Sequence, residues 1–113
     1  MHEMALAESV LQIVEEAAKR EGLHHVRTVW LEIGQLSCVE PEAMRFCFDA
    51  AAREGVAAGA RLECRTADGA AWCAACAREV PLAEIGAPCP DCGGYRLRPT
   101  AGTRMRVMEI EAE

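Results

Sequence analysis

The fold is decided by residues 73–92, which read CAACAREVPLAEIGAPCPDC. This stretch holds two C-x2-C pairs, Cys73 with Cys76 and Cys89 with Cys92, and twelve residues separate the pairs. Each pair fits a tight turn that aims two sulfurs at one ion, and four thiolates complete the closed tetrahedron of a structural zinc site. The spacing therefore predicts a four-thiolate zinc site, with two disulfides as the alternative.

The residues around the pairs favour zinc over iron. Rubredoxin-type iron knuckles also contain C-P-x-C-G, but no aromatic residue lies inside either pair and nothing else in the chain indicates electron transfer. The chain has seven cysteines, and in a reducing compartment such a number indicates metal ligands more than disulfides. A closed site leaves no position for a substrate, so we expect no catalysis at this metal.

Outward from the pairs, hydrophobic periodicity predicts two helices and three strands. In order, we expect a helix with Leu6, Val10, Ile13, Val14 and Ala17 on its apolar face and a stop at Gly22, a strand over 26–33, a helix from Pro41 to Gly55, and strands over 61–66 and 105–111. The fold class is α+β, a small three-stranded sheet with two helices and an inserted zinc-ribbon-like domain. We expect residues 1–68 plus 103–113 to form the α+β domain and residues 69–102 the zinc-binding domain.

The composition excludes several classes of protein. The chain has 113 residues, 51% of them hydrophobic, which fits one compact domain with a small appendage. Its net charge of −6 argues against nucleic acid as the main partner, because phosphate binding needs a basic face. No apolar stretch reaches the ~20 residues of a membrane span and no signal segment opens the chain, so we expect a cytoplasmic protein without a membrane span.

The amino terminus is a candidate site for a second metal. The chain begins Met1-His2-Glu3, and the bulky His2 should keep Met1 and its free amine in place. That amine, the His2 amide nitrogen and the His2 imidazole can close chelate rings on one ion, with the Glu3 amide or carboxylate as a fourth ligand. Nitrogen ligands in a tetragonal set suit Ni(II) or Cu(II), not tetrahedral zinc. The alternative is a solvated, inert histidine.

The remaining cysteines and histidines carry weaker signals. Cys47 lies on the apolar face of the second helix and Cys64 on the inward face of a strand, so we expect both in the core. Cys38 lies in a loop, where it either meets a metal or fills space. His24 and His25 are adjacent in a polar loop and project apart, so we expect them to be solvated.

In their order, these motifs resemble the HypA/HybF hydrogenase nickel incorporation proteins. The resemblance runs from residue 1 to about residue 111 and rests on Met1-His2-Glu3, Trp30-Leu31-Glu32-Ile33-Gly34, Ser37-Cys38-Val39-Glu40, Phe46-Cys47-Phe48-Asp49, the two C-x2-C pairs and Glu109-Ile110-Glu111. It implies a nickel metallochaperone and not an enzyme, with Ni(II) as transferred cargo and Zn(II) as a structural ion.

The resemblance also implies ligands and partners. Nickel binds through Met1, His2 and Glu3 of the α+β domain, with His2 as the side-chain ligand, and the four cysteines of the two pairs hold zinc. The family works with a nickel-binding GTPase of the HypB type. It delivers Ni(II) to the large subunit of [NiFe]-hydrogenase and, in some bacteria, to urease. Glu40 stands where the family can place a further carboxylate near nickel, and it fits a helix cap or a surface position equally well.

Two other classes stay open from the residues alone. A zinc-ribbon interaction module shares the cysteine spacing and needs neither the free amine nor His2. An enzyme is the third class, but the chain has histidines only at positions 2, 24 and 25 and shows no phosphate-binding loop and no Ser/His/Asp or Cys/His constellation. Nickel binding measured with and without a short amino-terminal extension distinguishes these classes.

Overall fold

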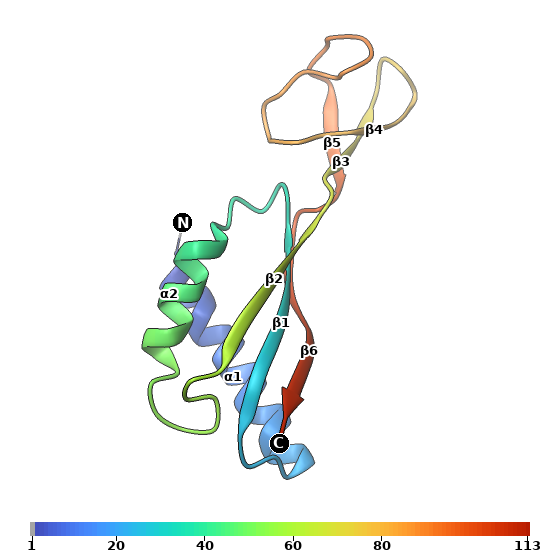
Figure 1. Cartoon of the computed structure of the whole chain (residues 1–113). Coiled ribbons are helices and arrows are strands. Elements are labelled where there is room, and N and C mark those ends of the chain that lie inside the picture. Colours follow the sequence, from blue (N-terminus) through green and yellow to red (C-terminus); the bar gives the residue numbers. More distant parts are fainter. Residues whose placement is uncertain (1) are drawn as a thin grey trace. The chain divides into compact units, whose positions relative to one another are not determined.

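The computed structural model describes residues 2–113, which form two helices and six strands (Figure 1). In chain order the elements are α1 (Glu3–Glu21), β1 (Val26–Gly34), α2 (Pro41–Ala51), β2 (Arg61–Ala67), β3 (Ala70–Cys73), β4 (Arg78–Pro81), β5 (Leu97–Ala101) and β6 (Met105–Ala112). The strands form two three-stranded sheets, in the orders β2-β1-β6 and β4-β3-β5. The predicted α+β class, with a small sheet, two helices and an inserted cysteine-rich segment, is confirmed.

The chain divides into two compact units. The helical unit comprises Met1–Glu32, Val39–Arg65 and Arg106–Glu113, of which residues from His2 onward are described. The cysteine unit comprises Ile33–Cys38 and Thr66–Met105. Neither helix of the described chain is long and apolar enough to cross a membrane.

In the helical unit, α1 buries a narrow stripe of small and β-branched side chains. The buried residues are Ala7, Val10, Val14 and Ala18, spaced three or four positions apart as one helix face requires. Ile13 was predicted on this face but is 49% exposed, because the stripe passes through its neighbour Val14 and leaves Ile13 at the margin. The helix ends as predicted at Gly22, whose left-handed φ of 68° suits a residue without a Cβ.

The second helix, α2, has the predicted start and an earlier end. Pro41 occupies the first turn, and the Glu40 carboxylate accepts a hydrogen bond from the Glu42 N–H at 3.2 Å. The helix stops at Ala51, not at Gly55 as predicted. The intervening chain turns back toward the sheet, where the Val56 carbonyl accepts a hydrogen bond from the Val26 N–H.

The sheet of the helical unit has β1 at its centre. The Val26 N–H bonds to the Val56 carbonyl before β2, and the Gln35 N–H bonds to the Ala67 carbonyl where β2 ends, so β1 and β2 run parallel. The Glu113 N–H bonds to the His25 carbonyl, so β6 runs antiparallel to β1. Both helices pack against one face of this sheet, as Figure 1 shows. The largest fully buried side chains here are Phe48, Leu31, Met44, Val10, Val14, Val26 and Val29.

The cysteine unit is built on β3, which pairs antiparallel with both β4 and β5. Its two small core clusters consist of Leu36, Ala71 and Leu82, and of Cys73, Val80 and Cys89. Two of these six buried residues are cysteines of the C-x2-C pairs. A core this small is typical of domains that depend on a bound metal.

Candidate metal centres

The cysteine unit brings the four predicted zinc ligands together. Cys73 ends β3 and Cys76 follows on the next turn, whereas Cys89 and Cys92 lie on a turn between β4 and β5. The sulfurs of Cys73 and Cys92 are 3.7 Å apart, those of Cys76 and Cys89 are 3.9 Å apart, and all four lie within 4.8 Å of one another. Sulfurs at the corners of a tetrahedron about 2.3 Å from a zinc ion stand ~3.8 Å apart. The cluster therefore has the dimensions of a four-thiolate zinc site.

These separations do not fit the alternative of two disulfides. A disulfide joins its sulfurs at about 2.05 Å, well below the closest Sγ–Sγ distance of 3.7 Å quoted above. All seven cysteines are free thiols in the structure. The close pairs also join one C-x2-C turn to the other, which is how a single ion would cross-link them.

The two C-x2-C turns share one backbone geometry. The Ala77 N–H bonds to the Cys73 carbonyl at 2.8 Å, and the Gly93 N–H bonds to the Cys89 carbonyl at 2.9 Å. Each turn then passes through a left-handed residue, Ala77 at φ 54° and Gly93 at φ 72°. Backbone N–H groups also point at sulfur, from Cys76 to Cys73 and from Gly94 to Cys92, both at 3.4 Å. Such N–H donors stabilise thiolates, the form that binds a metal.

Electrostatics within the cluster favour one thiolate over its neighbours. The hydrogen bond from the Cys76 N–H lowers the pKa of Cys73 to about 7. Hydrogen bonding with Cys92, together with burial, raises the pKa of Cys76 to about 12. Four thiols packed this closely cannot all ionise alone, and a divalent cation supplies the positive charge that lets them do so.

An ion pair that we did not predict links the two turns. The Arg78 guanidinium, just after the first turn, contacts the Asp91 carboxylate inside the second. Asp91 also raises the pKa of Arg78. In the sequence, the only sign of this pair is that two residues of opposite charge lie near cysteines. That pattern does not distinguish Arg78 and Asp91 from the other charged residues of the chain.

At the amino terminus, the structure describes His2 and Glu3, whereas Met1 lies outside the described residues. His2 is exposed at the N-cap of α1, and its side chain makes no capping hydrogen bond. Its carbonyl accepts a hydrogen bond from the Leu6 N–H at 3.1 Å. The first N–H groups of a helix have no acceptor within it, so the Glu3 amide nitrogen is outside the helical ladder.

The carboxylates near this terminus are engaged with backbone. Glu3 Oε2 accepts a hydrogen bond from the Glu40 N–H at 3.3 Å, which ties the start of α1 to the start of α2. The Glu40 carboxylate caps α2, one of the roles that the sequence left open. Within residues 2–113, the four cysteines are the one group of three or more His, Cys, Asp or Glu close enough to share an ion.

The weaker candidates lie outside the four-cysteine group. Cys38 is exposed at φ 62°, and Cys47 and Cys64 are half-buried, less than the core position predicted for them. Their helix and strand leave one side open to solvent, so neither thiol is fully enclosed. The His25 ring contacts the Ala58 carbonyl at 3.3 Å, and His24 is exposed.

Comparison with known proteins decides the family. A model of the family described as hydrogenase/urease nickel incorporation, metallochaperone, HypA matches residues 1–112. The chain belongs to the HypA family. The resemblance seen in the motifs is thereby confirmed, and with it membership in a family of nickel incorporation metallochaperones for hydrogenase and urease.

Relatives of the HypA family match this chain over its whole length. It is 63% identical to the hydrogenase maturation factor HypA of Albidiferax ferrireducens and 58% identical to that of Rhodopseudomonas palustris, each over 113 residues and 100% of both chains. Its fold is similar to the solution structure of the Ni metallochaperone HypA from Helicobacter pylori, with a TM-score of 0.71 at 24% identity, covering 99% of this chain and 97% of that one.

Proposed function

We propose that this chain binds Ni(II) through Met1, His2 and Glu3 and delivers it for the maturation of [NiFe]-hydrogenase, with urease as a second recipient. The observation that carries the proposal is the state of His2 in a HypA-family chain. Its imidazole is exposed and makes no capping bond, although it stands at the N-cap of α1. Helices favour Ser, Thr, Asp or Asn at this position, so a histidine there does little to stabilise the helix.

The ligands that we assign are the Met1 amine, the His2 imidazole and amide nitrogen, and a group of Glu3. Because the Glu3 carboxylate already accepts the Glu40 N–H, its amide nitrogen is the better fourth donor. A nitrogen-rich set of this kind suits Ni(II). It is open to solvent on the His2 side, as a site that must release its cargo requires.

We assign Zn(II) to Cys73, Cys76, Cys89 and Cys92 as a structural ion. Bound there, zinc would cross-link the two C-x2-C turns and neutralise their thiolates, and the closed set leaves no position for a reacting molecule. We therefore propose that residues 69–102 form the zinc-binding domain and that residues 1–68 plus 103–113 form the nickel-binding domain.

The partners follow from the function of the family. We propose a nickel-binding GTPase of the HypB type and the hydrogenase large subunit as the proteins that this chain contacts during transfer. We also propose that the chain works in the cytoplasm.

A two-residue extension at the amino terminus tests the nickel site. Extending the chain by Gly-Ser converts the Met1 amine into a peptide nitrogen and leaves the cysteines unchanged. We expect tight Ni(II) binding, measured by calorimetry on the zinc-loaded protein, to be lost while about one zinc per chain remains. Retention of tight nickel binding by the extended chain would mean that the ion binds elsewhere, whereas no tight nickel binding by either chain would favour the zinc-ribbon interaction module.

Delivery needs a separate test in cells. In a strain that lacks this protein, the unmodified chain should restore hydrogenase activity and the extended chain should not. Excess nickel in the medium should restore part of the activity, because a chaperone raises local supply and performs no chemistry on the ion. If the extended chain matures hydrogenase as well as the unmodified one, delivery does not use the terminal site.

A further inference from the structure

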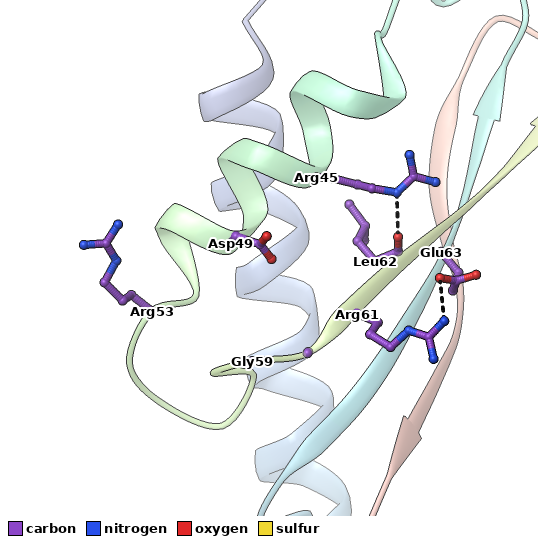
Figure 2. A pocket seen from close by; sticks show the side chains of 8 residues that line it. Arg45, Asp49, Arg53, Gly59, Arg61, Leu62 and Glu63 are labelled. Atoms are coloured by element: carbon purple, nitrogen blue, oxygen red, sulfur yellow. Dashed lines mark hydrogen bonds and ion pairs between the residues drawn. The ribbon is translucent and has the colours of Figure 1, made fainter.

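Arg78 makes contacts that differ in kind from those of two arginines on the helical unit. In a groove of about 540 Å³ between α2 and the beginning of β2, Arg61 contacts Glu63 of its own strand at 3.5 Å (Figure 2). Arg45 of α2 donates a hydrogen bond to the Leu62 carbonyl there at 3.1 Å. These contacts join neighbouring surface groups, and exposed pairs of this kind contribute little to stability. Arg78 instead contacts residues of the cysteine cluster.

The backbone fixes Arg78 beside the first C-x2-C turn. Arg78 is the first residue of β4 and pairs with Cys73 in the antiparallel ladder of β3 and β4. Side chains of directly paired residues lie on the same face of a sheet. The Arg78 side chain therefore lies on the face that carries the Cys73 sulfur. The turn just before it is closed by the hydrogen bond from the Ala77 N–H to the Cys73 carbonyl.

The Arg78 guanidinium joins the two turns. It contacts the carboxylate of Asp91, which lies between Cys89 and Cys92 in the second turn. The charge of Asp91 and, less strongly, a hydrogen bond that Arg78 donates to the Cys76 sulfur raise the pKa of Arg78. Hydrogen bonds between charged groups are stronger than those between neutral ones. One side chain thus connects a sulfur of the first turn to a carboxylate of the second.

Cys76 is one of the two cysteines of the cluster that solvent reaches. Cys73 and Cys89 are buried, with exposed fractions of 0% and 2%, whereas Cys76 is half-buried and Cys92 is exposed. Loss of a metal from a closed set begins where an accessible thiolate detaches. A backbone N–H reaches the Cys92 sulfur at 3.4 Å, and the Arg78 side chain donates to the Cys76 sulfur. Arg78 therefore acts on one of the two positions from which release can start.

We propose that Arg78 is a positioning residue of the metal centre, which slows the loss of the metal by holding the Cys76 thiolate in place. The guanidinium donates to the sulfur while Asp91 anchors it, so a detached thiolate stays beside the other three sulfurs and reattaches. Removal of a group that hydrogen-bonds a metal ligand typically costs about 10- to 100-fold in metal affinity. This role rests on the zinc assignment proposed above.

The test measures the rate at which the full-length zinc-loaded chain loses zinc to an excess of the coloured chelator pyridylazoresorcinol. Arg78→Gln should release zinc about tenfold faster than the unchanged chain. Asp91→Asn leaves the guanidinium without its anchor and should release zinc about two- to fivefold faster, the value of one exposed ion pair. The double variant should match Arg78→Gln, because Asp91 acts through Arg78.

Arg98→Gln is the matched control. Arg98 is exposed and pairs with Trp72, the neighbour of Cys73 in β3, so its side chain lies on the opposite face of the same sheet. Its replacement removes the same charge from the same unit and should leave the rate of zinc release unchanged.

The order in which the cysteines are labelled distinguishes positioning of Cys76 from a general loosening of the unit. With iodoacetamide present during release, mass spectrometry should find Cys92 labelled first in the unchanged chain and Cys76 labelled first in Arg78→Gln. Arg78→Lys keeps a cation that can donate to sulfur, so it should restore part of the slow release and the original order of labelling.

Three results would overturn the role of Arg78: zinc release by Arg78→Gln at the rate of the unchanged chain, equal acceleration in Arg98→Gln, or simultaneous labelling of all four cysteines in Arg78→Gln. If Arg78→Gln fails to hold zinc at all, Asp91→Asn decides. A larger share of Cys76 labelling in that variant supports the role, and an unchanged share overturns it. An unchanged chain that takes up no zinc would contradict the zinc assignment itself.

Discussion

Gly102 shows how a single backbone position shapes the cysteine unit. It has a φ of +74°, and a Cβ built on it would lie 2.6 Å from the Asp68 carbonyl oxygen. Its own carbonyl accepts a hydrogen bond from the Leu36 N–H at 2.7 Å. Gly86 also has a positive φ, +94°, but has open space around it. Comparing Gly86 with Gly102 therefore separates the energetic cost of a left-handed backbone from the cost of a steric clash with neighbouring backbone.

Alanine at these two glycines should therefore have unequal effects. Gly86→Ala should lower the free energy of unfolding by about 1–2 kcal/mol, the cost of a left-handed alanine. Gly102→Ala has the same cost and must also displace neighbouring backbone, so the total loss should be ~3 kcal/mol or more. Urea unfolding, monitored by hydrogen exchange of the β3 amides, measures the loss of stability in both variants. Equal losses for the two variants would contradict the close approach at Gly102.

Cys64 provides a pH-dependent prediction at the same scale. Burial raises the pKa of this thiol, and the charge of Arg45 opposes the rise. A raised pKa means less thiolate at any given pH, so alkylation of Cys64 by iodoacetamide should reach its midpoint above the ordinary thiol value of about 8.5. Arg45→Gln should move that midpoint higher still. Mass spectrometry at a series of pH values measures it, and a midpoint below the ordinary value would be inconsistent with the partial burial of Cys64.

At the scale of elements, α2 contrasts two phenylalanines two positions apart. Phe48 is fully buried in the core of the helical unit, whereas Phe46 is largely exposed. Phe48→Ala should destabilise the helical unit by about 3–5 kcal/mol, and Phe46→Ala should change its stability by less than ~0.5 kcal/mol. Circular dichroism at 222 nm during urea unfolding reports this, since both helices belong to that unit. Similar losses of stability in the two variants would contradict our assignment of the Phe48 side of α2 to the core.

The two C-x2-C turns should fold only with their metal. Cys73→Ala or Cys92→Ala removes one ligand from a closed set, and we expect zinc to fall from about one ion per chain to nearly none and residues 69–102 to unfold. The helices should remain. Cys38→Ala, which alters a thiol outside the cluster, is the matched control and should keep its zinc. Iron in place of zinc, or full zinc content in Cys73→Ala, would contradict the assignment.

The elements differ in how far the sequence predicts them. The C-x2-C spacing of the four cysteines predicts that their sulfurs lie close together. Each turn fixes the positions of its own two sulfurs, and binding of one ion brings the two turns together. Pro41 and Gly22 mark helix ends through their own backbone chemistry. The end of α2 and the pairing of β3 with β5 depend on residues distant in the chain, and no local pattern encodes such contacts. Likewise, the Arg78–Asp91 pair needs the folded turns before its charges meet.

On the scale of the whole molecule, the proposed sites place two metal chemistries in one short chain of the HypA family. Sulfur ligands in a closed tetrahedron retain zinc, while nitrogen ligands at an exposed chain end suit nickel that must be passed on. Because the ligand types differ, neither ion should displace the other at its own site. Under the proposed ligand sets, nickel binding should require His2 and zinc binding should not.

The most direct test of the central claim is the Ni(II) stoichiometry of the zinc-loaded His2→Ala variant, measured by equilibrium dialysis beside a matched His24→Ala variant. Both histidines are exposed, so neither change should disturb the fold. We predict that His2→Ala loses tight nickel binding and keeps about one zinc per chain, whereas His24→Ala binds nickel like the parent protein. Unchanged nickel binding by His2→Ala would contradict the assignment of the terminal site.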